Sequence, residues 1–220
     1  MYDYAVECKD VSKQYGPLRA LRGVTINIEI GDIVAVSGHN GAGKSTFLKI
    51  VGTHISSSSG NVKVLGNDTT KDRAKVRRDI GFLGHTSFMY NELTVEENLR
   101  FYGVMFSINR PTLDKRIKEV IEYVNLERYR HTAAKKLSHG LRKRADIARV
   151  FIHSPKVLIL DEPFSGLDEK SIKLLIDGFR SQIGKITMLI SSHSFEMMNS
   201  VFNRTLMFSE GKILKNDRVT

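Results

Sequence analysis

The sequence predicts a mixed α/β fold whose parallel strands carry a ligand site, and two segments support this prediction. IVAVS, at residues 33–37, is a short apolar run typical of a buried strand, and the glycine-rich segment GHNGAGKST follows it at residues 38–46. VLIL, at residues 157–160, is a second buried-strand pattern, and it ends in Asp161 and Glu162. Doubly wound sheets bind ligands at the carboxyl ends of such strands, so both segments should lie at one site.

The remaining elements complete the prediction in chain order. Residues 3–65 alternate in the manner of strands, and we expect an antiparallel β subdomain there. The alternation is clearest at Val24, Ile26, Ile28 and Ile30. Residues 94–154 should be helical, because Thr94 and Glu97 have capping-box spacing and Pro111 suits the first position of a helix. Strands and helices alternate again from residue 157 onward.

These elements are expected to form one domain over residues 1–220. Its core would consist of about residues 1–84 and 155–220, interrupted by a loop and a helical subdomain at about residues 85–154. No linker rich in Pro, Gly and Ser separates the parts, and 220 residues are enough for one sizeable core.

Composition restricts the compartment. A single cysteine, Cys8, excludes an internal disulfide and fits a reducing environment. The chain has neither an apolar run of about 18 residues nor a signal-peptide pattern at its start, so we expect a cytoplasmic protein that does not itself span a membrane.

The glycine-rich segment fits the pattern G-x-x-x-x-G-K-[ST]. Its glycines allow consecutive backbone N–H groups to curl around the β-phosphate of a nucleotide, Lys44 supplies a cation to the β- and γ-phosphates, and the Ser45 hydroxyl is a ligand for Mg²⁺. A glycine-rich turn without a ligand is disfavoured because a strand precedes the loop and a helix follows it. The candidate binding residues of the loop are Gly38, Asn40, Gly41, Gly43, Lys44, Ser45 and Thr46, with no individual role assigned to the Asn40 side chain.

The carboxylates after the second strand predict hydrolysis of the bound nucleotide. Asp161 would hold Mg²⁺ directly or through water, and Glu162 would polarise the attacking water. An acidic pair in a solvated loop is the alternative, and the phosphate loop in the same sheet disfavours it. The expected cofactors are therefore a nucleoside triphosphate and Mg²⁺, and the resemblance described next implies that the nucleotide is ATP.

LSHGLRKR, at residues 137–144, resembles the LSGGQ signature of the ATP-binding-cassette (ABC) ATPases, and the resemblance extends from Val6 to about Lys215. It implies the ABC ATPase fold, with a helical signature subdomain, and a homodimer or a paired ABC subunit with ATP at the interface. Ser138 and Gly140 would cap the γ-phosphate of the ATP held by the other subunit. Ser138 alone could equally be a helix N-cap.

Three further residues acquire roles from the same resemblance. Asp168, in SGLD, would belong to the loop that couples the two sites, and His193, in LISSHS, would sense the γ-phosphate. Tyr15, in KQYG, would stack on adenine. Taken alone, Tyr15 could be a surface aromatic and His193 the start of a capped helix.

The chain departs from the family pattern at two histidines. His85 stands where the family has Gln, and its imidazole could still contact the metal or the water, with added pH dependence; equally, Thr86 or a backbone group could do this work. His139 replaces the first Gly of the signature. That change is harmless if its backbone faces the phosphate, whereas the bulkier side chain could weaken dimer closure.

The net charge of +10 invites a nucleic-acid or membrane-surface interpretation. The basic clusters are residues 71–78 and the group Lys135, Lys136, Arg142, Lys143 and Arg144. A solvated face is the default for the second cluster, and contact with anionic lipid is the stronger alternative. No aromatic residues are interleaved with the basic ones, so nucleic acid is not favoured as a partner.

The resemblance therefore predicts the ATPase subunit of an ABC transporter, peripheral on the cytoplasmic face of the membrane and driving a separate transmembrane permease subunit. The segments GFLGHTSF and ELTVEENLRFYG are similar to those of haem-exporter ATPases of cytochrome c biogenesis, and small multidrug and lipid exporters fit equally. ABC ATPases that act on DNA or ribosomes are the alternative class. The expected docking residues for the permease are Phe88, Met89, Tyr90 and Phe101, although Phe101 is better explained as core.

Overall fold

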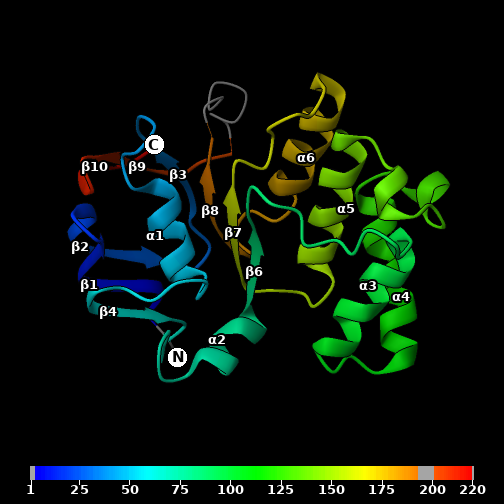
Figure 1. Ribbon diagram of the computed structural model, residues 1–220, viewed down its shortest axis with the longest axis horizontal. Helices are drawn as coiled ribbons and strands as arrows, with labels where there is room; N and C mark the ends of the chain where they lie inside the picture. Colours follow the sequence, from blue (N-terminus) through cyan, green and yellow to red (C-terminus); the bar gives the residue numbers. More distant parts are fainter. Residues whose placement is uncertain (1–2, 193–200, 220) are drawn as a thin grey trace.

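The computed structural model, which describes residues 3–192 and 201–219, contains two sheets and a group of helices at one end (Figure 1). The smaller sheet has the order β2-β1-β4-β5, and its strands pair antiparallel. Its strands are β1 (Tyr4–Tyr15), β2 (Leu18–Glu29), β4 (Ser59–Val64) and β5 (Asn67–Asp68). Val24, Ile26 and Ile28 of β2 are buried, as the predicted alternation requires. Ile30, the last residue of the predicted pattern, lies beyond the strand and is 54% exposed.

The larger sheet has the order β10-β9-β3-β8-β7-β6. Its strands are β3 (Ile33–Ser37), β6 (Ile80–Leu83), β7 (Val157–Asp161), β8 (Thr187–Ser191), β9 (Arg204–Ser209) and β10 (Lys212–Arg218). All neighbouring pairs are parallel except β9 and β10, which are antiparallel. The predicted mixed α/β class with an antiparallel subdomain is thereby confirmed.

Both faces of the larger sheet are covered, which explains the uninterrupted apolar runs. In β7, Val157 and Ile159 pack into the core on the side of the smaller sheet, whereas Leu158 and Leu160 pack into the core on the side of the helical group. Helix α1 (Lys44–Val51) fills the space between the two sheets, and α2 (Arg73–Asp79) leads into β6. Helix α6 (Glu169–Arg180) covers the opposite face.

The helical group consists of α3 (Val95–Met105), α4 (Arg110–Tyr123) and α5 (His139–Phe151), with short 3₁₀ turns at Glu127–Tyr129 and Ala134–Lys136 between α4 and α5. The expected capping box is present, because Thr94 Oγ1 accepts from the Glu97 N–H and the Glu97 carboxylate accepts from the Thr94 N–H. Pro111 lies in the first turn of α4, as predicted.

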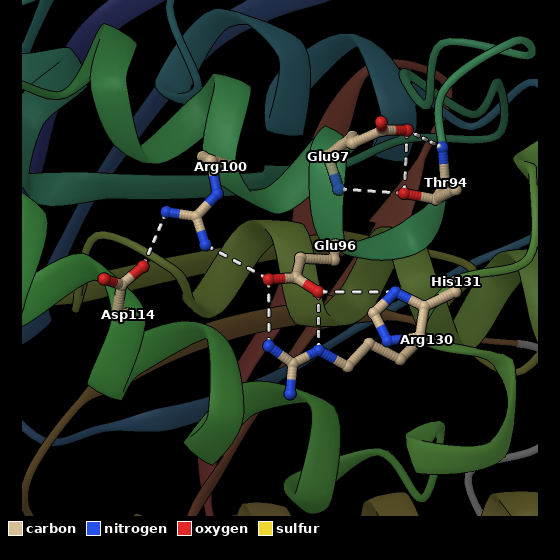
Figure 2. A network of polar contacts seen from close by, with 7 residues as sticks. All are labelled: Thr94, Glu96, Glu97, Arg100, Asp114, Arg130 and His131. Atoms are coloured by element: carbon tan, nitrogen blue, oxygen red, sulfur yellow. Dashed lines mark hydrogen bonds and ion pairs between the residues drawn. The ribbon is translucent and has the colours of Figure 1, made fainter.

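A polar network fastens this group together (Figure 2). Glu96, in the first turn of α3, accepts hydrogen bonds of 2.6 and 2.8 Å from Arg130 and one of 3.1 Å from Arg100. Arg100 in turn pairs with Asp114 of α4 at 2.6 Å. Glu96 therefore links both helices to the segment that enters the signature. Across the described part of the chain, no helix combines the length and apolar character needed to cross a membrane.

Candidate functional site

The glycine-rich loop between β3 and α1 folds around its own lysine. Lys44, the first residue of α1, is buried, and its Nζ donates to the carbonyl oxygens of Gly38 at 2.6 Å and His39 at 3.0 Å. Gly38 has φ +137°, and a Cβ there would collide with the carbonyl oxygen of Phe208. The loop therefore requires glycine at this position. A buried cation and the N-terminus of α1 meet at one point, which suits an anion.

A cavity of about 620 Å³ opens over this loop. Its lining residues come from five segments: Tyr15, Leu18, Arg19, Ala20 and Arg22 of the smaller sheet, residues 39–46 of the loop, His85 after β6, Glu162 after β7, and Glu210 with Gly211. Tyr15 ends β1 at the exposed rim, where Lys13 Nζ lies 5.1 Å from its ring centroid. The predicted base-stacking residue, phosphate loop and water-activating carboxylate thus share one cavity. Its size and its basic side chains suit a nucleotide polyphosphate.

Asp161 lies fully buried beside the cavity, at the end of β7. Its Oδ1 accepts a hydrogen bond from Ser45 Oγ at 3.1 Å and another from Ser191 Oγ at 2.7 Å. Within the described residues its Oδ2 accepts no hydrogen bond. A buried carboxylate oxygen without a donor, next to a serine hydroxyl, is a hard oxygen set of the kind Mg²⁺ prefers. The residues present therefore fit the expected metal ion.

Glu162 follows in a strained backbone conformation. Its φ is +53°, in the left-handed region that non-glycine residues rarely adopt, and its N–H is held by Ser191, whose carbonyl oxygen is at 3.2 Å and whose Oγ is at 3.0 Å. Such strain is retained where the surrounding structure over-determines it, commonly at functional sites. The sharp turn brings Glu162 into the lining of the cavity.

Ser191 was not among the residues predicted from the sequence. It ends β8, and the pairing of β7 with β8 places it opposite Asp161. The available signal was the segment TMLIS, another apolar strand that ends in a polar residue, as β7 does.

His85 lies in the loop after β6, and its Nε2 is 3.7 Å from Asp161 Oδ2. It also lines the nucleotide-sized cavity. His193, the predicted γ-phosphate sensor, lies outside the described residues.

The signature lies apart from this cavity. Ser138 is the N-cap of α5 and accepts from the Leu141 N–H at 3.3 Å, while Gly140 occupies the first turn. Neither residue is among those that line the cavity, and Figure 1 shows α5 and α1 on opposite sides of strands β6, β7 and β8. Asp168 caps α6, accepting from the Ser171 N–H at 3.1 Å. One copy of the chain therefore does not bring its signature to its own phosphate loop.

The unusual His139 of the signature contacts the SGLD loop. A Cβ at Gly166 would collide with the His139 ring nitrogen Nδ1, and Gly166 itself has φ +76°. The absence of a side chain at Gly166 leaves the space that the imidazole needs. The substitution at His139 is thus accommodated within one chain.

Of the basic cluster around the signature, Lys135 and Lys136 are exposed and Arg142 and Arg144 half-buried, but the expectation of a solvated side chain is wrong for Lys143. Lys143 is only 9% exposed, and its Nζ lies 3.5 Å from the carbonyl oxygen of Gly84. Burial lowers the pKa of Lys143, while the charge of Asp146 opposes this shift. This lysine points into the protein.

Arg142 and Arg144 also serve internal contacts. Arg142 donates to Asn91 Oδ1 at 2.6 Å, and Arg144 Nε donates to the carbonyl oxygen of Val124 at 2.7 Å. Loop carbonyls that face α5 need donors, and long basic side chains supply them.

The expected exposure of two candidate docking residues is also wrong. Met89 is 4% exposed and belongs to the core, so it offers no surface to a partner. Phe101, expected to be core, is 39% exposed and packs edge-on against Tyr90 with ring centroids 4.9 Å apart. Phe88 and Tyr90 are exposed, as a docking role requires.

The chain is similar to known ATP-binding proteins over most of its length. Residues 21–165 match the model of a family described as ABC transporter. The ATP-binding protein NatA of Bacillus subtilis (strain 168) is 32% identical over 90% of this chain and 81% of its own length. The bacitracin transport ATP-binding protein BcrA of Bacillus licheniformis is 32% identical over 96% and 68%, respectively. A dimeric, post-hydrolysis structure of the ATP-binding cassette MJ0796 bound to ADP and Pi is similar at 27% identity, with a TM-score of 0.87, 98% of this chain and 99% of that one covered.

Proposed function

The chain belongs to the ABC transporter family and is an ATP-binding, ATP-hydrolysing subunit that dimerises around ATP, and we propose the following roles for its residues. The Gly38–Gly43 loop and Lys44 hold the β- and γ-phosphates, and Tyr15 stacks on the adenine. His85 contacts the γ-phosphate side of the site from the loop after β6. These assignments are supported by the single cavity that Tyr15, the loop, His85 and Glu162 line together.

The acidic end of β7 supplies the hydrolytic groups in this proposal. Ser45 and Asp161 would hold Mg²⁺, which neutralises charge on the phosphate oxygens when it is bound. Glu162 orients and polarises the water that attacks the γ-phosphate in line, and Ser191 keeps the Asp161 carboxylate and the Glu162 backbone in position. The support is the buried Asp161 Oδ2 without a donor among the described residues, the hydrogen bond that Ser191 donates to Asp161 Oδ1, and the one that it accepts from the Glu162 N–H.

The observation that carries the dimer model is the separation of Ser138 and Gly140 from the cavity of their own chain. A second copy can supply its signature, so that each ATP is enclosed by the loop of one chain and the α5 N-terminus of the other. His193 would complete the site. Asp168 and Gly166 lie next to the signature and are suited to connect the two halves.

Dimerisation with Mg·ATP tests this arrangement. Glu162→Gln keeps the shape of the side chain but removes the carboxylate that activates water, so dimers should accumulate and be visible by gel filtration. Adding Ser138→Arg should abolish these dimers, because it places a long side chain where the second ATP must dock. Ser181→Arg, on the exposed end of α6, is the control. If the Ser138→Arg chain still forms ATP-dependent dimers, the signature does not face the nucleotide.

The subunit works with a transmembrane partner, and we place it at the cytoplasmic face of the membrane. The exposed rings of Phe88 and Tyr90 support contact with the permease near the loop that carries His85. Large aromatic side chains left exposed beside a functional loop are typical of an interface centre. Phe88 lies three residues after His85, on the same loop.

A further inference from the structure

A cavity of about 240 Å³ lies between the loop after β6 and helix α5. Its lining consists of Gly84, His85, Ser87, His139, Arg142, Lys143 and Asp146. The four residues from α5 recur at helical spacing, so they share one face of that helix. His85 also lines the nucleotide cavity, whereas Ser138 of the signature lines neither cavity. The smaller cavity therefore adjoins the nucleotide site without being part of it.

Lys143 brings a buried cation to this cavity. It is 9% exposed, and among the described residues its Nζ has one hydrogen-bond acceptor, the Gly84 carbonyl oxygen at 3.5 Å. That distance is at the outer limit for a hydrogen bond, and an ammonium group has three N–H donors. No Asp or Glu of the described residues lies within ion-pair distance of this Nζ. Because buried charges in proteins are normally paired, the ammonium group of Lys143 is suited to bind an anion.

The acid of the lining does not pair with this lysine, because both of its oxygens are engaged elsewhere. Asp146 Oδ1 accepts from Arg149 Nε at 2.6 Å, and Asp146 Oδ2 accepts from the Phe88 N–H at 3.2 Å. Arg142 adds a second cation to the lining, and among the described residues it donates only to uncharged oxygens. Positive charge therefore exceeds negative charge in this cavity, and an anion would be attracted there.

Nearby carboxylates favour the charged form of Lys143 from a distance. Burial lowers the pKa of Lys143, and the charges of Asp146, Asp161 and Glu162 oppose this shift. None of the three lies within ion-pair distance of Lys143, so their fields favour the ammonium form without occupying its N–H groups. The donors of Lys143 remain available to a ligand.

Uncharged donors surround the remaining space. The Ser87 hydroxyl accepts from the Met89 N–H at 3.2 Å, which leaves its own O–H to donate. His85 and His139 are exposed residues of the lining, and each neutral imidazole carries one N–H donor. A tetrahedral oxyanion accepts hydrogen bonds in several directions, so it matches donors that converge from a helix and a loop. A cavity of about 240 Å³ holds such an ion with several waters, since one water occupies about 30 Å³.

We propose that this cavity is a second oxyanion site, which binds free inorganic phosphate while a nucleotide occupies the first cavity. Lys143 and Arg142 bind the phosphate from α5, and Ser87 donates to it from the loop after β6. Bound phosphate joins this loop to α5 and places negative charge beside His85 and Asp161. That charge opposes the negative charge that gathers on the γ-phosphate during hydrolysis, so phosphate lowers kcat without competing with ATP. The effect on kcat rests on the proposed function, whereas the binding of phosphate does not.

Equilibrium dialysis against radiolabelled inorganic phosphate, in a buffer free of sulfate, tests the site directly. The wild-type chain is loaded with Mg²⁺ and AMP-PNP, a nucleotide that is not hydrolysed and whose own terminal phosphate fills the first cavity. One phosphate per chain should still bind. If phosphate binds only in the absence of AMP-PNP, or does not bind at all, the second site does not exist and the inference is overturned.

Variants assign the binding to the cavity. Lys143→Met should weaken phosphate binding at least about tenfold, because it removes a buried charge-assisted contact. Lys136→Met is the matched control: it removes the same charge from an exposed lysine outside the cavity, and its effect should stay below about twofold. Ser87→Ala, on the opposite wall, should weaken binding by a smaller factor, and it takes the place of Lys143→Met if that chain does not fold. Equal affinities in Lys143→Met and Lys136→Met would overturn the inference.

Steady-state ATPase kinetics with added phosphate give an independent readout. In the wild type, phosphate should lower kcat and leave the KM for ATP unchanged, and Lys143→Met should resist this inhibition. Inhibition that is purely competitive with ATP, and equal in both chains, would mean that phosphate binds only at the γ-phosphate position, which overturns the inference. Failure of the wild-type chain to bind AMP-PNP would instead contradict the proposed function, and dialysis without nucleotide would still compare Lys143→Met with Lys136→Met.

Discussion

Ser191 and Asp161 end two neighbouring parallel strands, and the Ser191 hydroxyl donates a 2.7 Å hydrogen bond to Asp161 Oδ1. The same serine accepts from the Glu162 N–H through both its hydroxyl and its carbonyl oxygen. Ser191 of β8 thus orients the Asp161 carboxylate at the end of β7 and the backbone of Glu162, the next residue. Two of the assigned roles, metal binding and water activation, depend on it.

Ser191→Ala should weaken metal-dependent turnover while leaving the fold intact. Loss of a hydrogen bond that orients a metal ligand commonly costs about 10- to 100-fold in metal affinity or activity. We therefore expect a higher Mg²⁺ concentration for half-maximal ATPase activity, with a smaller change in the ATP requirement. Ser181→Ala, at the protein surface, is the control. An unchanged Mg²⁺ dependence would show that Ser191 does not position Asp161.

Glu162→Gln and Lys44→Ala should separate hydrolysis from binding. Glu162→Gln should keep nucleotide affinity and lower turnover by about 10²- to 10⁴-fold, the usual contribution of general base catalysis. Lys44→Ala should lose affinity, because it deletes the buried cation that faces the phosphates. Binding of a fluorescent ATP analogue and steady-state phosphate release measure the two properties. Wild-type turnover in Glu162→Gln would remove this residue from the mechanism.

His85→Gln restores the amide found in the family and removes a group that protons can charge. If the neutral imidazole acts beside Asp161, wild-type ATPase activity should fall in mildly acidic solution and the variant should resist this fall. The comparison requires full pH profiles of kcat for both chains, with His193 left intact. Superimposable profiles would show that the His85 side chain does not take part in turnover. Thr86 or a backbone group would then make the contact with the metal or the water.

Glu96→Gln should remove stability that depends on pH. The hydrogen bond from Arg130 lowers the pKa of Glu96 from 4.5 to about 2 in the folded chain. Because the folded-state pKa is the lower one, the stabilisation is complete above about pH 4.5 and is lost as the pH falls toward 2. At neutral pH the variant should lose at most about 3 kcal/mol of unfolding free energy, and less where solvent screens the exposed arginines.

Urea unfolding at about pH 7 and about pH 3 measures this difference. The gap between wild type and Glu96→Gln should narrow at the lower pH. Glu92→Gln, which removes a solvent-exposed ion pair with Lys135, should have a small effect at both values. A gap that stays constant with pH would mean that the network of Figure 2 acts through packing rather than through charge.

Predictions that depend on local sequence agreed with the structure. The glycine loop, its strand and its helix are adjacent in the chain, so their order alone implied where Lys44 and Ser45 would lie. The capping box at Thr94 and the burial of β7 follow for the same reason, since each depends on residues a few positions apart.

Predictions about the exposure of single side chains agreed less well. Helical spacing suggested that Lys143 faces solvent, but the loop at Gly84 packs over that side of α5 and buries it. Met89 and Phe101 exchanged their expected environments, because the loop after β6 turns the Met89 side chain into the core, whereas Phe101 lies on an exposed side of α3 beside Tyr90. Periodicity reports which residues share a face, and only packing decides what covers that face.

The sequence by itself determined the family, the α/β class, the phosphate loop and the carboxylates at the end of β7, because these reside in short motifs whose chemistry requires a fixed spacing. Tertiary structure alone decided that Ser191 holds Asp161, that His139 lies over Gly166, and that Lys143 and His85 line one cavity. Each of these relationships joins segments from different elements. Strand register and helix packing bring such segments together, and neither can be predicted from the residues of one segment alone.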